Sequence, residues 1–199
     1  ALQRLTKLKT DQEVPRQVFL FSGHMIDAPN RPTPRFPAEK EASAAQHIAT
    51  ALKNLGAGPQ DWALTQGACG GDLLFTEACQ QLGVKVQWLQ PFDEPEFIQK
   101  SVVCHSEAWR SRYLTAKAKL AFEIRAAPQA LGAIPTDSDP YERCNLWLLY
   151  TALAQGIQKV QFICLWDGGG GDGPGGTAHM YHEVKRRTGQ VTRIDTHAL

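Results

Sequence analysis

Apolar runs alternate with amphipathic segments along most of the chain, and the two patterns predict different elements. Runs that are apolar at consecutive positions are typical of strands buried on both faces of a sheet. Four such runs predict strands at residues 17–22, 61–65, 84–89 and 159–166. Weaker apolar patterns predict two further short strands, at residues 119–124 and 190–194.

The segments between these strands carry apolar residues at the spacing of a helix. Six of them predict helices, at residues 38–55, 71–82, 94–104, 107–117, 139–154 and 177–187. Gly56 and Gly83 end the first two, because glycine readily adopts the backbone conformation found just after a helix. One of residues 137–139 caps the fifth helix, which has Pro140 in its first turn.

Strands and helices alternate along the sequence, which is typical of a parallel sheet with helices packed on both of its faces. The expected fold class is therefore α/β, a three-layer sandwich with a mainly parallel sheet. Residues 1–16 are polar and end in Val14-Pro15-Arg16, so they are expected to form a tail or linker. Residues 17–199 are enough for a single domain.

The composition is that of an ordinary soluble protein, with 43% hydrophobic and 21% charged residues. The net charge of +1 predicts no direct binding to nucleic acid and no attraction to a membrane surface. The apolar runs are also too short to span a bilayer. The five cysteines form no CxxC pair, so free buried thiols in a reducing cytoplasm fit them better than a zinc site.

A dense glycine run is the strongest candidate for binding chemistry. Between Asp167 and Thr177 the chain reads DGGGGDGPGGT, which places seven glycines between a predicted strand and a predicted helix. Glycine lets backbone N–H groups approach a ligand, and a helix start offers unpaired N–H groups and a positive dipole end. We expect a nucleotide-type anion at Gly175, Gly176 and Thr177. The alternative is that 168–176 is a flexible surface loop.

Two other predicted strand ends carry glycine turns, SGHMIDAP after the first strand and GACGGD after the second. In open α/β sheets, ligands bind beyond the carboxyl ends of the strands, near the switch in strand order. These ends and the end of the fifth strand add seven candidate ligand contacts: Ser22, Gly23, His24, Gly67, Gly70, Gly71 and Asp167. The alternative is that Gly23 and Gly67 only form tight turns.

Three charged residues near these strand ends complete the candidate set. Asp72 either caps the helix that follows it or accepts hydrogen bonds from a ribose. Arg35 lies in the loop 24–37, which four prolines stiffen, and its guanidinium either binds phosphate or is solvated. Arg143 either faces the ligand or pairs with a carboxylate for structure.

Two further patterns are expected to be structural. His179 and His182 share a helix face with Glu183, but a metal would need another ligand that the sequence does not signal. We therefore expect no metal and no cofactor. Trp147 and Trp166 lie in apolar surroundings and are expected in the core rather than as stacking platforms.

Three motifs together resemble the SLOG superfamily, which includes the Lonely Guy phosphoribohydrolases and the DNA-processing protein A family. They are FSGHMIDAP, GACGGDLLFTEA and GPGGTAHMYHE, and the resemblance spans roughly residues 17–195. It implies a Rossmann-like domain that binds a nucleotide-type small molecule. Similar domains serve as bacterial signalling modules beside cyclase, TIR or tetratricopeptide-type regions. The resemblance is therefore compatible with fused effector or repeat domains and with a homo-oligomer.

The chain departs from the hydrolases of that superfamily at the last motif. Thr177 follows Gly176 directly, and the acidic residue Glu183 comes six positions after Thr177, whereas the hydrolases have theirs at about three, where Met180 stands here. The departure favours a sensor of a nucleotide-derived, ADP-ribose-like ligand. The alternative is an enzyme that cleaves or transfers the N-glycosidic bond of nucleoside monophosphates. In that case Glu183 or Asp72 stabilises the developing charge and Arg143 holds the phosphate.

Overall fold

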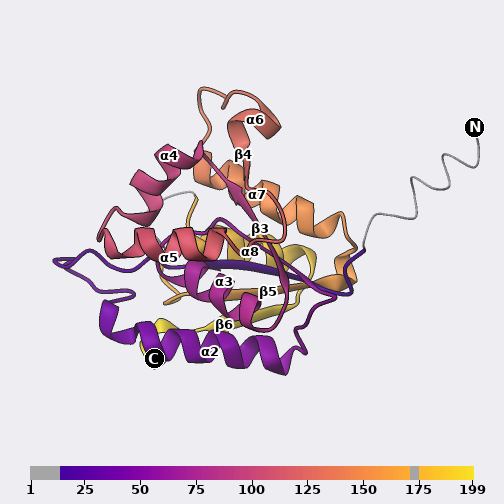
Figure 1. The fold of residues 1–199 in the computed structure, drawn as a ribbon, viewed down its shortest axis with the longest axis horizontal. Coiled ribbons are helices and arrows are strands. Elements are labelled where there is room, and N and C mark those ends of the chain that lie inside the picture. The colour runs from indigo at the N-terminus through magenta and orange to yellow at the C-terminus, as the bar shows by residue number, and fades with distance from the viewer. Residues whose placement is uncertain (1–13, 171–174) are drawn as a thin grey trace, which may run out of the picture.

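A six-stranded parallel sheet forms the centre of the molecule (Figure 1). The computed structural model describes residues 14–170 and 175–199. The sheet has the order β4-β3-β2-β1-β5-β6. Its strands are β1 Val18–Gly23, β2 Trp62–Thr65, β3 Lys85–Gln90, β4 Arg125–Ala126, β5 Val160–Leu165 and β6 Val191–Ile194.

Helices cover both faces of this sheet, as the sequence predicts. The main helices are α2 Glu41–Asn54, α3 Gly71–Gln81, α5 Ala108–Lys117, α7 Pro140–Leu153 and α8 Thr177–Arg187. Shorter segments are η1 Ala38–Lys40, α4 Glu94–Phe97, η2 Ile98–Val102, α6 Ala127–Leu131, η3 Ile157–Lys159 and η4 Thr196–Ala198. Buried side chains of α2, α3 and α5 share one apolar cluster, and those of α7 and α8 share the other. The fold is therefore a Rossmann-like three-layer α/β sandwich.

Strand β1 contributes to both clusters because its successive side chains point to opposite faces of the sheet. Val18 and Leu20 pack with α7 and α8, whereas Phe19 and Phe21 pack with α2 and α3. All four are fully or almost fully buried, and the ring of Phe21 stacks on Phe75 of α3. This two-sided burial explains why the strand is apolar at consecutive positions.

The strand order reverses between β1 and β5. The chain adds β2, β3 and β4 outward from β1, and then returns to place β5 on the other side of β1. The two strands are paired to their ends, with Ser22 beside Cys164 and Gly23 beside Leu165. The helix after β1 covers one face of the sheet and α8 after β5 covers the other. The backbone therefore diverges at the carboxyl ends of these strands, where such folds leave a crevice.

One predicted strand is wrong, and one predicted helix is present with an irregular second half. Residues 119–124 do not form a strand; the two-residue strand β4 follows them at the sheet edge. Lys119 and Glu123 are exposed and none of residues 119–124 is buried, whereas a strand inside a parallel sheet is buried on both faces. The predicted helix at 94–104 consists of α4 and the wider turn η2, in which the Val103 N–H bonds to the Ile98 carbonyl.

The segment just before β1 is tied to the sheet by a buried carboxylate. Arg16 donates from Nε and Nη2 to the two oxygens of Asp61, at 3.0 and 2.6 Å, and Asp61 is fully buried. The same carboxylate accepts the backbone N–H groups of Gln17 and Gly58. Pro15 and Arg16 thus contact the domain, and residues 1–13 of the predicted tail lie outside the described residues. Within residues 14–170 and 175–199, every helix is too short or too polar to span a bilayer.

The GACGGD turn joins the start of α3 to the chain that leaves β1. Gly70 has φ +80°, and a Cβ atom there would lie 2.5 Å from the backbone nitrogen of Ile26. The N–H of Gly71 donates to the carbonyl of His24 at 3.0 Å. A Cβ at Gly67, with φ +88°, would lie 2.7 Å from the Trp88 ring. These glycines therefore permit close packing of two loops at the same edge of the sheet.

The packing of this turn predicts the effect of one added methyl group. Gly70→Ala should lower the free energy of unfolding by about 3 kcal/mol, because it adds a strained φ and a backbone clash. Urea denaturation measures the loss. Gly58→Ala is the control, since φ is unstrained there and an added Cβ would meet no described atom within 4 Å. Equal losses in the two variants would contradict the packing described for Gly70.

Candidate functional site

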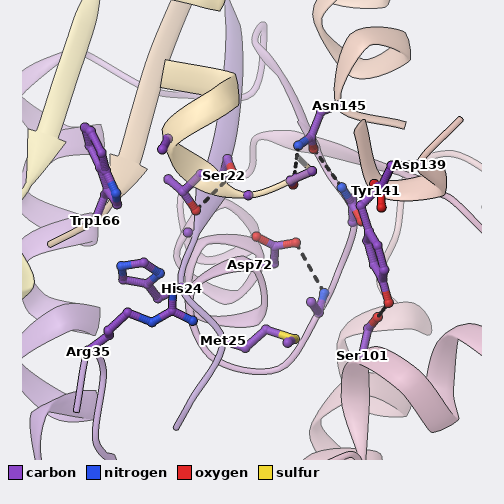
Figure 2. Close-up of a pocket in the computed structure, with 17 residues that line it drawn as sticks. Ser22, His24, Met25, Arg35, Asp72, Ser101, Asp139, Tyr141, Asn145 and Trp166 are labelled. Atoms are coloured by element: carbon purple, nitrogen blue, oxygen red, sulfur yellow. Dashed lines mark hydrogen bonds between the residues drawn. The ribbon is translucent and has the colours of Figure 1, made fainter. Parts of the chain in front are cut away.

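A cavity of about 380 Å³ opens where the carboxyl ends of β1, β2 and β5 meet (Figure 2). Its walls come from the loop after β1, the start of α3, the η2 segment, the first turns of α7 and the N-terminus of α8. Many of the residues that the sequence singles out line it. They are Ser22, Gly23, His24, Arg35, Asp72, Gly175, Gly176 and Thr177.

The N-terminus of α8 forms one wall of the cavity. Gly176 is the N-cap in extended conformation, and no described side chain hydrogen-bonds to this cap. The helix starts Thr177-Ala178-His179, without an acidic residue, so its positive dipole end has no counter-charge in its own first turn. Unpaired N–H groups at such an end favour an anion.

Two side chains hold this helix start in place. Asn145 of α7 donates from Nδ2 to the carbonyl of Gly175 at 2.7 Å, and its Oδ1 accepts from Gln66 at 2.9 Å. Ser22 donates to Thr177 Oγ1 at 3.4 Å (Figure 2). A Cβ at Gly175 would lie 2.7 Å from the Asp139 carboxylate that caps α7, so only glycine lets the chain pass here. These contacts hold the start of α8 against α7 and β1.

His24 and Arg35 line one side of the cavity, and Asp167, which is not part of the described lining, pairs with His24. His24 is buried, with Nε2 3.1 Å from the Asp167 carboxylate. Burial lowers the pKa of His24 and the Arg35 guanidinium lowers it further, although Asp167 opposes both effects. Burial also opposes ionisation of Asp167, but the Gly169 N–H, His24 and Arg35 together lower its pKa. The lowered pKa of His24 favours its neutral form, and the lowered pKa of Asp167 favours its carboxylate.

Asp72 places a carboxyl group in the middle of the cavity wall (Figure 2). Burial raises its pKa to about 6, although Ala68, Thr65, Gln66 and Gly67 lower it by hydrogen bonding. The N-cap of α3 is Gly70, and the Asp72 side chain instead accepts the N–H of Ala68 at 3.3 Å. Asp72 therefore secures the loop before α3 and also faces the cavity.

Two aromatic side chains, Tyr141 and Trp166, also line the cavity. The sequence does not predict either of them as a ligand contact. Figure 2 shows Trp166 and Tyr141 on opposite sides of the cavity. The Tyr141 hydroxyl lies 3.0 Å from Ser101 Oγ, and Trp166 donates from Nε1 to the Gly169 carbonyl at 3.0 Å. Trp166 also belongs to the apolar cluster under α7 and α8, as expected, so it serves both the core and the cavity. The position of Tyr141 in the first turn of a helix after a loop is the signal that was available in the sequence.

Other candidate residues are placed elsewhere. Gly67, Gly70, Gly71, Asp167, Arg143 and Glu183 are not among the described residues that line the cavity. Arg143 donates to the carbonyls of Gly132 and Leu131. Glu183 pairs with Arg186 and Arg187. Because Glu183 lies six residues into α8, it is about 9 Å along the axis from the helix start. Residues 171–174 of the glycine run lie outside the described residues.

The two histidines of α8 also have local contacts. His179 Nε2 lies 3.4 Å from Glu142, and the His182 ring packs edge-on against Trp166 and Tyr181. Among the residues that the structure describes, no three His, Cys, Asp or Glu side chains are grouped so that they could hold a metal ion.

Comparison with models of known protein families finds no match for this chain, and comparison with curated proteins finds none either. The resemblance to the SLOG superfamily therefore stays a prediction from the three motifs.

The raised pKa of Asp72 predicts a pH dependence of stability. Between about pH 4 and pH 6 the folded protein binds more protons at this carboxyl group than the unfolded chain does. The free energy of unfolding that Asp72 contributes therefore decreases as the pH rises through this range. Asp72→Asn removes this titration. The stability of the variant relative to the unmodified protein should therefore increase by about 3 kcal/mol from pH 4 to pH 7.

Urea denaturation of both proteins at a series of pH values measures this difference. Using the difference cancels the contributions of His24 and the other titrating groups. Asp137→Asn, at an exposed position, is the control for the loss of a carboxyl group. A difference between Asp72→Asn and the unmodified protein that stays constant with pH would contradict the burial of an ionisable Asp72.

Proposed function

We propose that the cavity binds a nucleotide or a nucleotide-derived ligand, with a phosphate group at the start of α8. The observation that carries the proposal is the glycine-capped N-terminus of α8, which opens onto a cavity at the switch point of a parallel sheet. Helix N-termini at such points are the usual phosphate sites of α/β folds.

The other walls supply what the rest of such a ligand would need. Arg35 lines the cavity and offers a planar cation that can donate two hydrogen bonds to a phosphate. Trp166 and Tyr141 offer aromatic faces for a base, and Asp72 offers a polar group for a sugar hydroxyl. The volume of about 380 Å³ lies within the range of small-molecule sites.

Binding is favoured over catalysis by the positions of two charged residues. Glu183 and Arg143, which the sequence offers as catalytic and phosphate-holding groups, are engaged in local contacts outside the cavity lining. We therefore favour a sensor of an ADP-ribose-like signal over a hydrolase. The SLOG resemblance extends this proposal to a cytoplasmic bacterial signalling module that passes its ligand state to attached domains or to a second copy.

Calorimetric titration with AMP, ADP and ADP-ribose tests the binding proposal. Arg35→Gln should weaken binding at least tenfold, because a hydrogen bond between charged groups contributes about 1.5–3 kcal/mol. Arg31→Gln is the control: it removes the same charge from the same loop at a residue that is not part of the described lining. No binding of any of these ligands by the unmodified protein would reject the proposal, and equal weakening in both variants would assign the effect to the loop.

One observation favours a second candidate, cleavage of an N-glycosidic bond. Asp72 is a buried carboxyl group with a raised pKa in a cavity, and such groups are enriched at catalytic sites. Its ionised form could stabilise positive charge that develops on a ribose ring. In that case the protein should release ribose 5-phosphate from AMP, and Asp72→Asn should abolish release while AMP still binds. Absence of release by the unmodified protein would reject the enzyme.

A further inference from the structure

A buried carboxyl group faces the cavity from the start of α3. Asp72 is only 6% exposed, and it lines the cavity. One of its oxygens accepts the Ala68 N–H at 3.3 Å, and Figure 2 shows the other oxygen directed away from that bond. A ligand in the cavity therefore meets this carboxyl group directly.

The turn that carries Asp72 is packed closely against the chain that leaves β1. Asp72 directly follows Gly70 and Gly71, and the Gly71 N–H donates to the His24 carbonyl at 3.0 Å. At Gly70, a Cβ atom would lie 2.5 Å from the backbone nitrogen of Ile26. This packing leaves the backbone of the turn little space to shift. A ligand without a donor at this place would therefore leave the carboxylate unpaired, and sites of this kind reject such ligands strongly.

The chemistry of the carboxyl group decides which part of a ligand can lie against it. Burial raises the pKa of Asp72 to about 6, so at neutral pH the group is mainly a carboxylate. The largest effects that offset this burial are hydrogen bonds of the loop before α3, rather than the charge of a neighbouring cation. A carboxylate accepts hydrogen bonds but donates none, and it repels a phosphate. The part of the ligand next to Asp72 must therefore be a neutral donor, such as a hydroxyl group.

The place of Asp72 among the lining residues matches the sugar of a nucleotide. In a nucleotide the ribose lies between the phosphate and the base. Ser22 and Asn145 hold the start of α8, where the phosphate is proposed to bind. Figure 2 shows these two residues above Asp72, and Trp166 and Tyr141 to either side of it. The carboxylate thus lies between the proposed phosphate site and the aromatic walls that could contact a base.

We infer that the cavity selects ribonucleotides over 2′-deoxyribonucleotides, because Asp72 accepts a hydrogen bond from the ribose 2′-hydroxyl. This inference rests on the proposed function and names the residue that determines which sugar is bound. A hydrogen bond to an ionised acceptor is roughly twice as strong as one between neutral groups. A 2′-deoxyribose leaves the buried carboxylate without that donor, and an unpaired buried group opposes binding.

Calorimetric titration of the full chain with paired ligands tests the inference. AMP, ADP and ADP-ribose are each compared with the analogue that lacks the 2′-hydroxyl of the adenosine ribose, which should bind at least tenfold more weakly. The 2′-fluoro analogues, which cannot donate, should bind as weakly as the 2′-deoxy analogues. Equal affinity for a ribonucleotide and its 2′-deoxy or 2′-fluoro analogue would overturn the inference and leave the proposed function standing. Absence of binding by all three ribonucleotides would reject both.

Variants assign the preference to Asp72, and the ratio of the two affinities cancels any general weakening of the site. Asp72→Asn should reduce a tenfold preference for the ribonucleotide to about threefold, because a neutral acceptor forms a weaker hydrogen bond. Asp72→Ala should abolish the preference. Asp139→Asn is the control, since Asp139 also lines the cavity and asparagine can still accept the Glu142 N–H that Asp139 caps. A preference that is retained in Asp72→Ala, or lost in Asp139→Asn, would contradict the role of Asp72.

Discussion

The parallel pairing of β1 with both β2 and β5 is the constraint on which the rest of this structure depends. Because β1 has neighbours on both edges and helices on both faces, its side chains from Val18 to Phe21 must all be apolar. Because the chains that leave β1 and β5 run to opposite faces, the backbone separates just beyond Ser22 and Gly23. A cavity forms here because the helices that follow β1 and β5 pack on opposite faces of the sheet and leave the space between them open.

The fold class and the bounds of most elements could be predicted from local pattern, since consecutive apolar residues, glycine stops and helical spacing are physical requirements of the elements themselves. Helix α8 begins and ends at the predicted residues. Residues 119–124 do not form the expected strand. Whether a short segment at the edge of a sheet pairs as a strand depends on what packs beside it. Likewise, the wide turn η2 satisfies tertiary contacts, such as the bond between Ser101 and Cys69, that no local pattern encodes.

The location of the candidate site could be predicted from the sequence, but which side chains point into the cavity could not. Strand ends identify the edge where Ser22, His24 and Asp72 gather, because parallel strands end together. The pairing of Glu183 with Arg186 and Arg187 follows a local rule, because residues three and four apart on a helix are neighbours. Nothing local indicates that Arg143 donates to the carbonyls of Leu131 and Gly132, since that contact depends on how the preceding loop packs against α7.

The ion pair between Arg16 and Asp61 anchors the chain at the start of β1. Arg16 fixes the chain at the amino end of the sheet, and Ser22 lies in the cavity at the carboxyl end, about 20 Å away along one extended strand. A load applied to the chain before residue 16 would first meet this ion pair and the sheet hydrogen bonds of β1, which resist it in shear. The ion pair thus anchors the amino end of the same strand whose carboxyl end lines the cavity.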